Sequence, residues 1–180
     1  MVRNMKTAVL GYSGSGKSTL AKQLAEHYGV PVLYLDTVQY LPGWKKRGRE
    51  ESRSIVSAFM RDNASWVIDG NYGGFLQEER LRQADRIILL LFPRRICFFR
   101  AWKRSFRNRG KTRESMADGC AEKMDMEFAR WILFEGRTKK KRKHYREIAS
   151  LYSDKTLVLK TPGQVREFLE QIVPRETESP

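Results

Sequence analysis

Residues 11–19 read Gly11-Tyr12-Ser13-Gly14-Ser15-Gly16-Lys17-Ser18-Thr19. This stretch follows a short apolar run at residues 7–10 and leads into a helix-like segment at residues 20–26. Glycines let the backbone fold tightly enough for successive amide N–H groups to face one anion-sized hollow, and the start of a helix adds unpaired N–H donors. A strand, a glycine-rich turn and a helix in this order predict a phosphate-binding loop, with an ordinary turn as the alternative.

The loop also carries the two side chains that nucleotide chemistry needs. Lys17 supplies a point charge for the β- and γ-phosphates, and the Ser18 hydroxyl is a ligand for Mg²⁺. The sequence contains no Asn-Lys-x-Asp guanine motif, so we expect ATP rather than GTP. The predicted cofactors are therefore ATP and Mg²⁺, and the predicted cofactor-binding residues of the loop are Gly11, Ser13, Gly14, Ser15, Gly16, Lys17, Ser18 and Thr19.

The composition of the chain is that of a folded domain. It has 180 residues, of which 41% are hydrophobic, and this size suits a single domain with a sizeable core. No apolar run reaches the roughly 20 residues of a membrane span, and the first strand begins too early for a signal peptide. Cys97 and Cys120 lack the spacing of metal ligands, so we expect two reduced thiols. These features predict a cytoplasmic protein that does not enter a membrane.

The net charge of +14 is concentrated in one segment of the chain. Residues 93–146 hold 18 of the 35 Lys and Arg residues but six of the 21 acidic residues, which gives them a net charge of +12 and leaves +2 for the rest. A local basic block of this kind serves polyphosphate chemistry as readily as it binds a nucleic-acid backbone.

Apolar strands alternate with helical patterns along the whole chain. We expect strands at residues 7–11, 30–35, 66–68, 87–92 and 156–159, and helices at 17–28, 52–62, 75–83, 93–108, 122–152 (broken at Gly136) and 164–173. An irregular loop rich in Gly, Pro and Lys is expected at 41–49. This order predicts a three-layer α/β fold, and ligands of such folds bind at the carboxyl ends of the strands.

Two acidic residues stand at predicted strand ends. Asp69 closes the strand at residues 66–68, where an acid holds Mg²⁺ beside a phosphate loop, although an aspartate that caps a turn is the alternative. Asp36 closes the strand at residues 30–35, where a carboxylate can orient an acceptor hydroxyl for in-line attack, or simply cap the next segment. Trp44 either stacks on a flat acceptor or covers the core.

The helix after Pro93 has an aromatic face and a basic face. Phe99, Trp102 and Phe106 recur at helical spacing, and we expect them to pack into the core. The basic face carries Arg100, Arg104 and Arg107, whose like charges repel unless an anion lies beside them. A triphosphate supplies such an anion. The following glycine-containing loop carries Arg109 and Arg113, and we expect it to close over the transferring phosphoryl group as a lid.

Several segments together resemble a known family. The phosphate loop, the strand that ends at Asp69-Gly70, the arginines of the helix after Pro93 and residues 109–113 look like the adenylate-kinase-like P-loop kinases. More narrowly, residues 66–72, 109–113, 119–123 and 128–132 resemble the bacterial DNA topology modulation proteins.

The resemblance implies a P-loop NTPase fold with a five-stranded parallel sheet in the order 2-3-1-4-5. It implies one domain, at residues 1–173, with an acceptor-binding insert at 37–63 and a lid at 108–125. We expect the last residues, 174–180, to form a flexible tail. By this likeness Lys17 and Ser18 bind phosphate and Mg²⁺, Asp69 lies by the metal, and Arg100 and Arg104 grip the ATP side.

The chain departs from the nucleoside monophosphate kinases at one informative position. Those enzymes carry Asp-Gly-Phe-Pro-Arg where this chain has Asp69-Gly70-Asn71-Tyr72-Gly73, so the arginine that would hold a monophosphate is missing. The leading hypothesis is an ATP-dependent phosphotransferase with an unidentified small acceptor and with catalytic residues Lys17, Asp36, Asp69, Arg100, Arg104 and Arg113. The alternative is a nucleic-acid-binding P-loop ATPase or regulator of DNA topology that uses residues 93–146.

Overall fold

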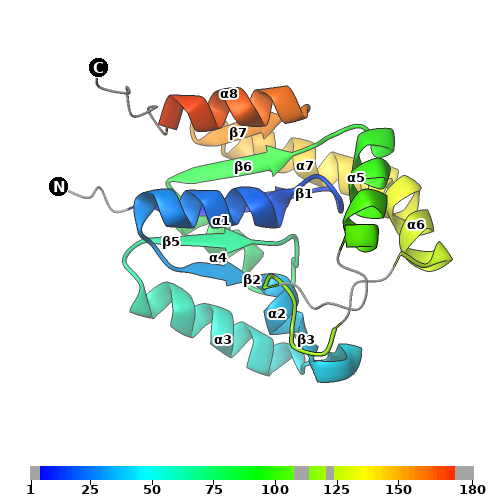
Figure 1. Ribbon diagram of the computed structural model, residues 1–180. Coiled ribbons are helices and arrows are strands. Elements are labelled where there is room, and N and C mark those ends of the chain that lie inside the picture. The colour runs from blue at the N-terminus through cyan, green and yellow to red at the C-terminus, as the bar shows by residue number, and fades with distance from the viewer. Residues whose placement is uncertain (1–4, 108–113, 121–123, 173–180) are drawn as a thin grey trace, which may run out of the picture.

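The computed structural model describes residues 5–107, 114–120 and 124–172. Its centre is a five-stranded parallel sheet (Figure 1). In chain order the strands are β1 (Lys6–Gly11), β2 (Val32–Tyr34), β5 (Trp66–Asp69), β6 (Arg86–Leu90) and β7 (Thr156–Leu159). They lie side by side in the order β2-β5-β1-β6-β7, which confirms the predicted order 2-3-1-4-5.

The unbroken apolar runs of the sequence form the middle of this sheet. β1 pairs with β5 on one side and with β6 on the other, and Ala8 and Ile87 are completely buried. Parallel strands of this kind are covered on both faces, so every residue of the run is apolar rather than every second one. The register places Asp69 beside Val9, and Gly11 beside Leu90, so the ends of three strands lie at one edge of the sheet.

Helices cover both faces of the sheet, and Figure 1 shows α1 in front of it with α4 and α7 behind. These layers confirm the predicted three-layer α/β fold. No helix of the described residues combines the length and the apolar character needed to cross a membrane. The main helices are α1 (Lys17–Tyr28), α3 (Arg49–Asp62), α4 (Gln77–Gln83), α5 (Arg94–Arg107), α6 (Met126–Leu133), α7 (Lys139–Leu151) and α8 (Pro162–Ile172).

The segment after β2 is more ordered than the sequence suggested. The short helix α2 (Leu35–Gln39) follows β2 directly, so the strand ends before Asp36 rather than at it. A small antiparallel hairpin then replaces the irregular loop expected at residues 41–49: it consists of β3 (Tyr40–Leu41), the 3₁₀ turn η1 (Pro42–Trp44) and β4 (Lys45–Lys46). Gly43 and Trp44 both take a positive φ in the turn, and Trp44 donates its backbone N–H to the Cys120 sulfur at 3.3 Å.

The predicted break at Gly136 is confirmed. Residues 126–151 form α6, a 3₁₀ turn η2 (Glu135–Arg137) and α7 instead of one long helix. A Cβ atom at Gly136 would lie 2.8 Å from the Trp131 carbonyl oxygen, so a larger residue would not fit this turn. Cys97 and Cys120 are both free thiols, as the sequence predicted.

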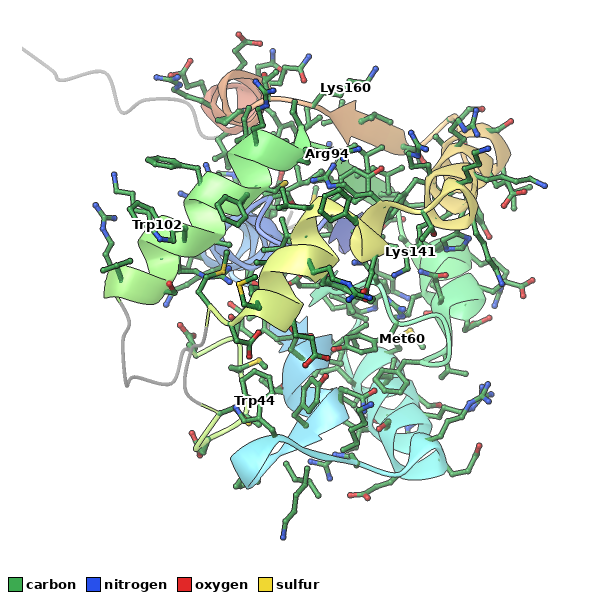
Figure 2. All side chains as sticks on the ribbon, turned by 90° about the vertical axis from the view of Figure 1, so that its right-hand side faces the viewer. Trp44, Met60, Arg94, Trp102, Lys141 and Lys160 are labelled. Atoms are coloured by element: carbon green, nitrogen blue, oxygen red, sulfur yellow. The ribbon has the colours of Figure 1, made fainter. Side chains whose placement is uncertain are left out.

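The predicted core stripe of α5 is wrong. Phe99, Trp102 and Phe106 are 58%, 45% and 63% exposed, respectively, and Figure 2 shows Trp102 on the outer side of the helix. The helix instead turns its small residues Cys97 and Ala101 inward, where both are almost completely buried. Small residues allow α5 to approach the rest of the protein closely, and this leaves the bulky face outside.

Candidate active site

The glycine-rich loop between β1 and α1 is held in a compact turn. Gly14 has φ +79°, and a Cβ atom at this position would lie 2.3 Å from the Cys97 carbonyl oxygen on α5. The Ser15 amide and hydroxyl both donate to the Tyr12 carbonyl oxygen, at 3.2 and 2.7 Å. The loop is therefore pre-shaped before any ligand arrives, and it ends at the N-terminus of α1, where unpaired amide donors favour an anion.

Two cationic side chains lie at this loop. The Lys17 ammonium donates to the Tyr12 carbonyl oxygen at 3.1 Å. The Arg100 guanidinium comes from α5, and its Nη2 atom is 2.7 Å from the place that a Cβ atom of Gly16 would occupy. Arg104 lies one helical turn further along α5. The structure thus brings Lys17 and Arg100 to the same loop.

Ser18 and Asp69 meet although they lie 51 residues apart. The Ser18 hydroxyl donates to Asp69 Oδ2 at 2.6 Å. Asp69 ends β5, beside β1, and its side chain is 5% exposed. A hydroxyl and a carboxylate next to a phosphate hollow are the hard oxygen donors that Mg²⁺ prefers, so this pair fits the metal site that the fold family implies.

Asn71 also belongs to the site, although the sequence analysis assigned it no role. Its Oδ1 atom accepts the Gly11 amide at 2.9 Å, and its Nδ2 atom donates to the Gly11 carbonyl oxygen at 2.8 Å. This two-way bond fastens the loop after β5 to the end of β1, where the phosphate loop begins. An amide side chain two residues beyond a strand-end aspartate is the signal that could have revealed it.

Arg80 is a second residue that the sequence analysis missed. It is completely buried and donates to the carbonyl oxygens of Phe75 and Tyr72, both at 2.9 Å, and of Gly70 at 3.4 Å. Burial lowers the pKa of Arg80 to about 10, while the Asp69 charge acts in the opposite direction. The side chain holds the loop at residues 70–75 in shape. Nothing in its polar sequence context, Glu78 to Gln83, distinguished it from a surface arginine.

Asp36, the residue expected to orient an acceptor, lies in the first turn of α2. The Tyr72 hydroxyl donates to Asp36 Oδ1 at 2.5 Å. Burial, followed by the charge of Asp36, raises the pKa of Tyr72 well above its usual value, so Tyr72 stays a hydroxyl donor. Tyr72 also lines a cavity of about 290 Å³, together with Gln39, Lys46, Arg47, Arg49, Gly73, Gly74 and Phe75.

The remaining residues of the hairpin have structural partners. Arg47 donates from Nε to the Val38 carbonyl oxygen at 2.9 Å and forms an ion pair with Glu51, so it fastens the hairpin to α3. Trp44 is partly exposed, packs edge-on against Tyr40 and is absent from the lining of the cavity. It is therefore part of the hairpin rather than of the core.

The basic block at residues 93–146 is not a uniform solvated surface. Arg130 forms an ion pair with Glu135. Trp131 donates its indole N–H to the Ser13 hydroxyl at 3.2 Å, which brings α6 against the loop. Arg109 and Arg113, together with part of the expected lid at 108–125, lie outside the described residues, and so does the tail at 174–180.

Solved structures of other proteins are similar to this chain along nearly its whole length. No model of a known family matches the sequence, and no curated protein matches it either. Among solved structures, an uncharacterized protein from Eubacterium ventriosum is similar, with 18% identity, a TM-score of 0.53 and coverage of 96% of this chain and 100% of that one. A shikimate kinase from Acinetobacter baumannii, solved in complex with shikimate, has 17% identity, a TM-score of 0.55 and coverage of 97% and 96%. The chain has the fold of a P-loop kinase.

A shikimate kinase from Bacteroides thetaiotaomicron is similar as well, with 18% identity, a TM-score of 0.50 and coverage of 93% of this chain and 95% of that one. Identities this low show the P-loop kinase fold and leave the reaction open. None of the three structures carries the name of the DNA topology modulation family, so that narrower resemblance stays a prediction.

Proposed function

We propose that this P-loop kinase fold catalyses the transfer of the γ-phosphoryl group of ATP to a small acceptor. The hydrogen bond between the Ser18 hydroxyl and Asp69 Oδ2 carries the proposal, because it joins the phosphate loop to a buried carboxylate at the end of a neighbouring strand. A phosphate loop alone serves many nucleotide-binding proteins. A buried acid beside its serine is what positions a divalent cation for phosphoryl transfer.

Each residue of the phosphate side has a role in this proposal. The amides of residues 13–18 and the Lys17 ammonium would hold the β- and γ-phosphates, and Arg100 would lie over them from α5. Ser18 and Asp69 would hold Mg²⁺, which would supply positive charge to stabilise the phosphates during the transfer. Arg104, Arg109 and Arg113 would close on the transferring group and exclude water.

Asp36 is the residue that we propose for the acceptor. Its carboxylate would accept a hydrogen bond from an acceptor hydroxyl, while Tyr72 fixes the orientation of the carboxylate. In the transfer, the acceptor oxygen forms a bond to the γ-phosphorus, the bond from that phosphorus to the bridging oxygen breaks, ADP leaves, and the hydroxyl proton passes to Asp36. The basic lining of the adjoining cavity, with Lys46 and Arg49, favours an acceptor that carries a negative charge.

A coupled ATP-turnover screen tests this proposal. The acceptors are nucleosides, nucleotides, small alcohols and hydroxy acids, and the control enzyme is Lys17→Ala. We expect one acceptor class to raise turnover, and the Lys17→Ala variant to be slower by about 10³-fold because it lacks a charge that stabilises the transition state. If calorimetry detects no binding of Mg²⁺ and ATP to the folded wild-type protein, or if no acceptor raises its turnover above that of Lys17→Ala, the proposal fails.

The organisation of the chain follows from the same proposal. Residues 1–173 would form one kinase domain of a cytoplasmic protein, with the acceptor-binding insert at 37–63, the lid at 108–125 and a tail at 174–180. The resemblance to the DNA topology modulation family belongs to this proposal too, because the comparisons support the broader P-loop kinase class.

The outer face of α5 favours a second candidate function, in which the chain is a nucleic-acid-binding ATPase. The exposed rings of Phe99, Trp102 and Phe106 lie in a row, and Lys103 and Arg107 are exposed on the same helix. Aromatic rings with neighbouring cations are typical of surfaces on which single-stranded bases stack. A salt titration of oligonucleotide binding tests this candidate, since counterion release predicts a steep loss of affinity, and absence of binding at low salt excludes it.

A further inference from the structure

A second cavity, of about 470 Å³, lies next to the phosphate loop. Its lining consists of Tyr12, Pro93, Arg94, Arg95, Arg137 and Arg142, and we call it the arginine pocket. The four arginines come from the first turn of α5, from η2 and from α7, so three separate elements converge on it. Figure 2 shows Arg94 on the face where the carboxyl ends of the strands lie. Among the described residues, no acidic side chain lines it.

Arg137 is the fixed member of the pocket. Its Nε atom donates to the Ile132 carbonyl oxygen at 3.0 Å, and its Nη1 atom donates to the Phe92 carbonyl oxygen at 2.9 Å. The guanidinium carbon stacks over the Tyr12 ring, 3.8 Å from the ring centroid. Neutral partners therefore hold this cation in place, and no ion pair with another described residue compensates its positive charge.

The other three arginines increase the positive charge of the cavity. Within the described residues, no ion pair involves Arg94, Arg95 or Arg142, and Arg94 contacts the Phe134 ring instead of an acid. Four guanidinium groups around one space repel each other. An anion with several charges removes this repulsion and accepts bidentate hydrogen bonds, for which the planar guanidinium is suited. The volume is within the range of small-molecule sites.

One residue links the arginine pocket to the phosphate hollow. The hollow is formed by residues 13–18 with Arg100, and none of these lines the arginine pocket. Tyr12 lines the pocket and contacts the hollow: its ring lies against Arg137, while its carbonyl oxygen accepts the Ser15 amide and the Lys17 ammonium. Tyr12 therefore connects a ligand in the pocket with the loop that would bind ATP.

From this arrangement we propose that the arginine pocket binds a small anion with several phosphate groups, at a site separate from the phosphate loop. The binding itself does not depend on the proposed kinase function. Occupancy of the pocket changes the affinity of the phosphate loop for ATP, through Tyr12, and this second part rests on the proposed function.

Calorimetric titration with inorganic tripolyphosphate tests the binding. The variant is Arg95→Gln with Arg142→Gln, two residues of the pocket. The matched control is Lys103→Gln with Arg146→Gln, which removes the same charge from exposed positions on α5 and α7 outside the pocket. We expect two sites in the wild type and in the control, and one site in the pocket variant, or a second site weakened at least about tenfold there.

Three results would overturn the proposal. The first is an unchanged titration of the pocket variant, and the second is an equal loss in the control, which would indicate a general charge effect. The third is that a 12-mer of single-stranded DNA binds more tightly than tripolyphosphate and is lost in the same pocket variant, which would assign the pocket to a nucleic-acid backbone. Lys17→Ala separates the two sites: it weakens the loop site but leaves the pocket site intact, even if no kinase activity is found.

Discussion

The two sides proposed for the site, the phosphate side and the acceptor side, differ in how firmly buried contacts hold their residues. On the phosphate side, Asp69 is buried, Asn71 clasps Gly11 with two hydrogen bonds, and Gly14 lies against the backbone of α5. On the acceptor side, Asp36 has a hydrogen bond from Tyr72, and the neighbouring hairpin consists of two strands of two residues each. Figure 2 shows Trp44 of this hairpin at one end of the molecule, away from Arg94.

This difference separates a part of the site that is fixed by buried contacts from a part that has fewer of them. Rigid, buried polar groups bind a ligand without paying for reorganisation, so the phosphate side suits a ligand that never changes. A small exposed hairpin tolerates changes of sequence, so it suits the choice of an acceptor. We therefore expect substitutions on the phosphate side to destroy activity in general, and those on the acceptor side to alter turnover of one substrate.

The largest expected effect distinguishes the role of Asp69 from that of Asp36. Asp69→Asn should lower ATP turnover by about 10³-fold and raise the Mg²⁺ concentration needed for half-maximal rate, because the amide is a poorer ligand for the cation. Asp36→Asn should lower turnover by about 10²-fold, since it removes a proton acceptor, and should leave the Mg²⁺ dependence unchanged. Steady-state kinetics at several Mg²⁺ concentrations measure both. Equal Mg²⁺ dependence in the two variants would show that Asp69 has no metal role.

The next effect compares two glycines with nearly the same positive φ. Gly14 has φ +79°, and a Cβ atom added there would lie 2.3 Å from the Cys97 carbonyl oxygen, whereas Gly43 has φ +74° with no atom within 4 Å of that position. Gly43→Ala should lower the free energy of unfolding by about 1 kcal/mol, the cost of the left-handed backbone alone. Gly14→Ala should lower it by about 3 kcal/mol or more, because the clash forces the loop or α5 to move.

Urea denaturation of the two variants measures this difference. The phosphate loop of Gly14→Ala should also lose its affinity for ATP, while Gly43→Ala should keep it. If both alanine variants are destabilised equally, the crowding between the phosphate loop and α5 contributes nothing to stability.

The smallest expected effect concerns the Tyr72 hydroxyl. Tyr72→Phe leaves the ring in place but removes the donor that orients Asp36, so turnover should fall about fivefold and stability by about 1 kcal/mol. ATP binding, measured by calorimetry, should not change, because the lost hydrogen bond lies on the acceptor side. Tyr152→Phe, at the end of α7, serves as the control and should behave like the wild type. Weaker ATP binding in Tyr72→Phe would mean that the two sides are not independent.

Much of the phosphate side could be predicted from the sequence, because its signals are local. The phosphate loop lies between a strand and a helix whose periodicity is clear, and the strand-end position of Asp69 predicted its place next to Ser18. The order of the sheet came from the family resemblance, and the strand ends were correct to within two residues for most strands. Local patterns are reliable where short-range geometry determines the structure.

The parts that could not be predicted depend on contacts between distant segments. Arg80 looks like a surface residue until the loop at residues 70–75 surrounds it. The aromatic stripe of α5 has the periodicity of a core face, but close packing of Cys97 against Gly14 turns the opposite face inward. Periodicity shows that a helix has two faces and does not show which of them a neighbour will accept. The hairpin at residues 40–46 is too short to leave a period-two signal.

The close contact between Gly14 and the backbone of Cys97 has a mechanical consequence. Because no side chain separates the two backbones, a tilt or slide of α5 would displace the glycine-rich loop. The opposite face of α5 carries the exposed rings of Phe99, Trp102 and Phe106. A partner that contacts these rings and shifts α5 would therefore shift the glycine-rich loop as well.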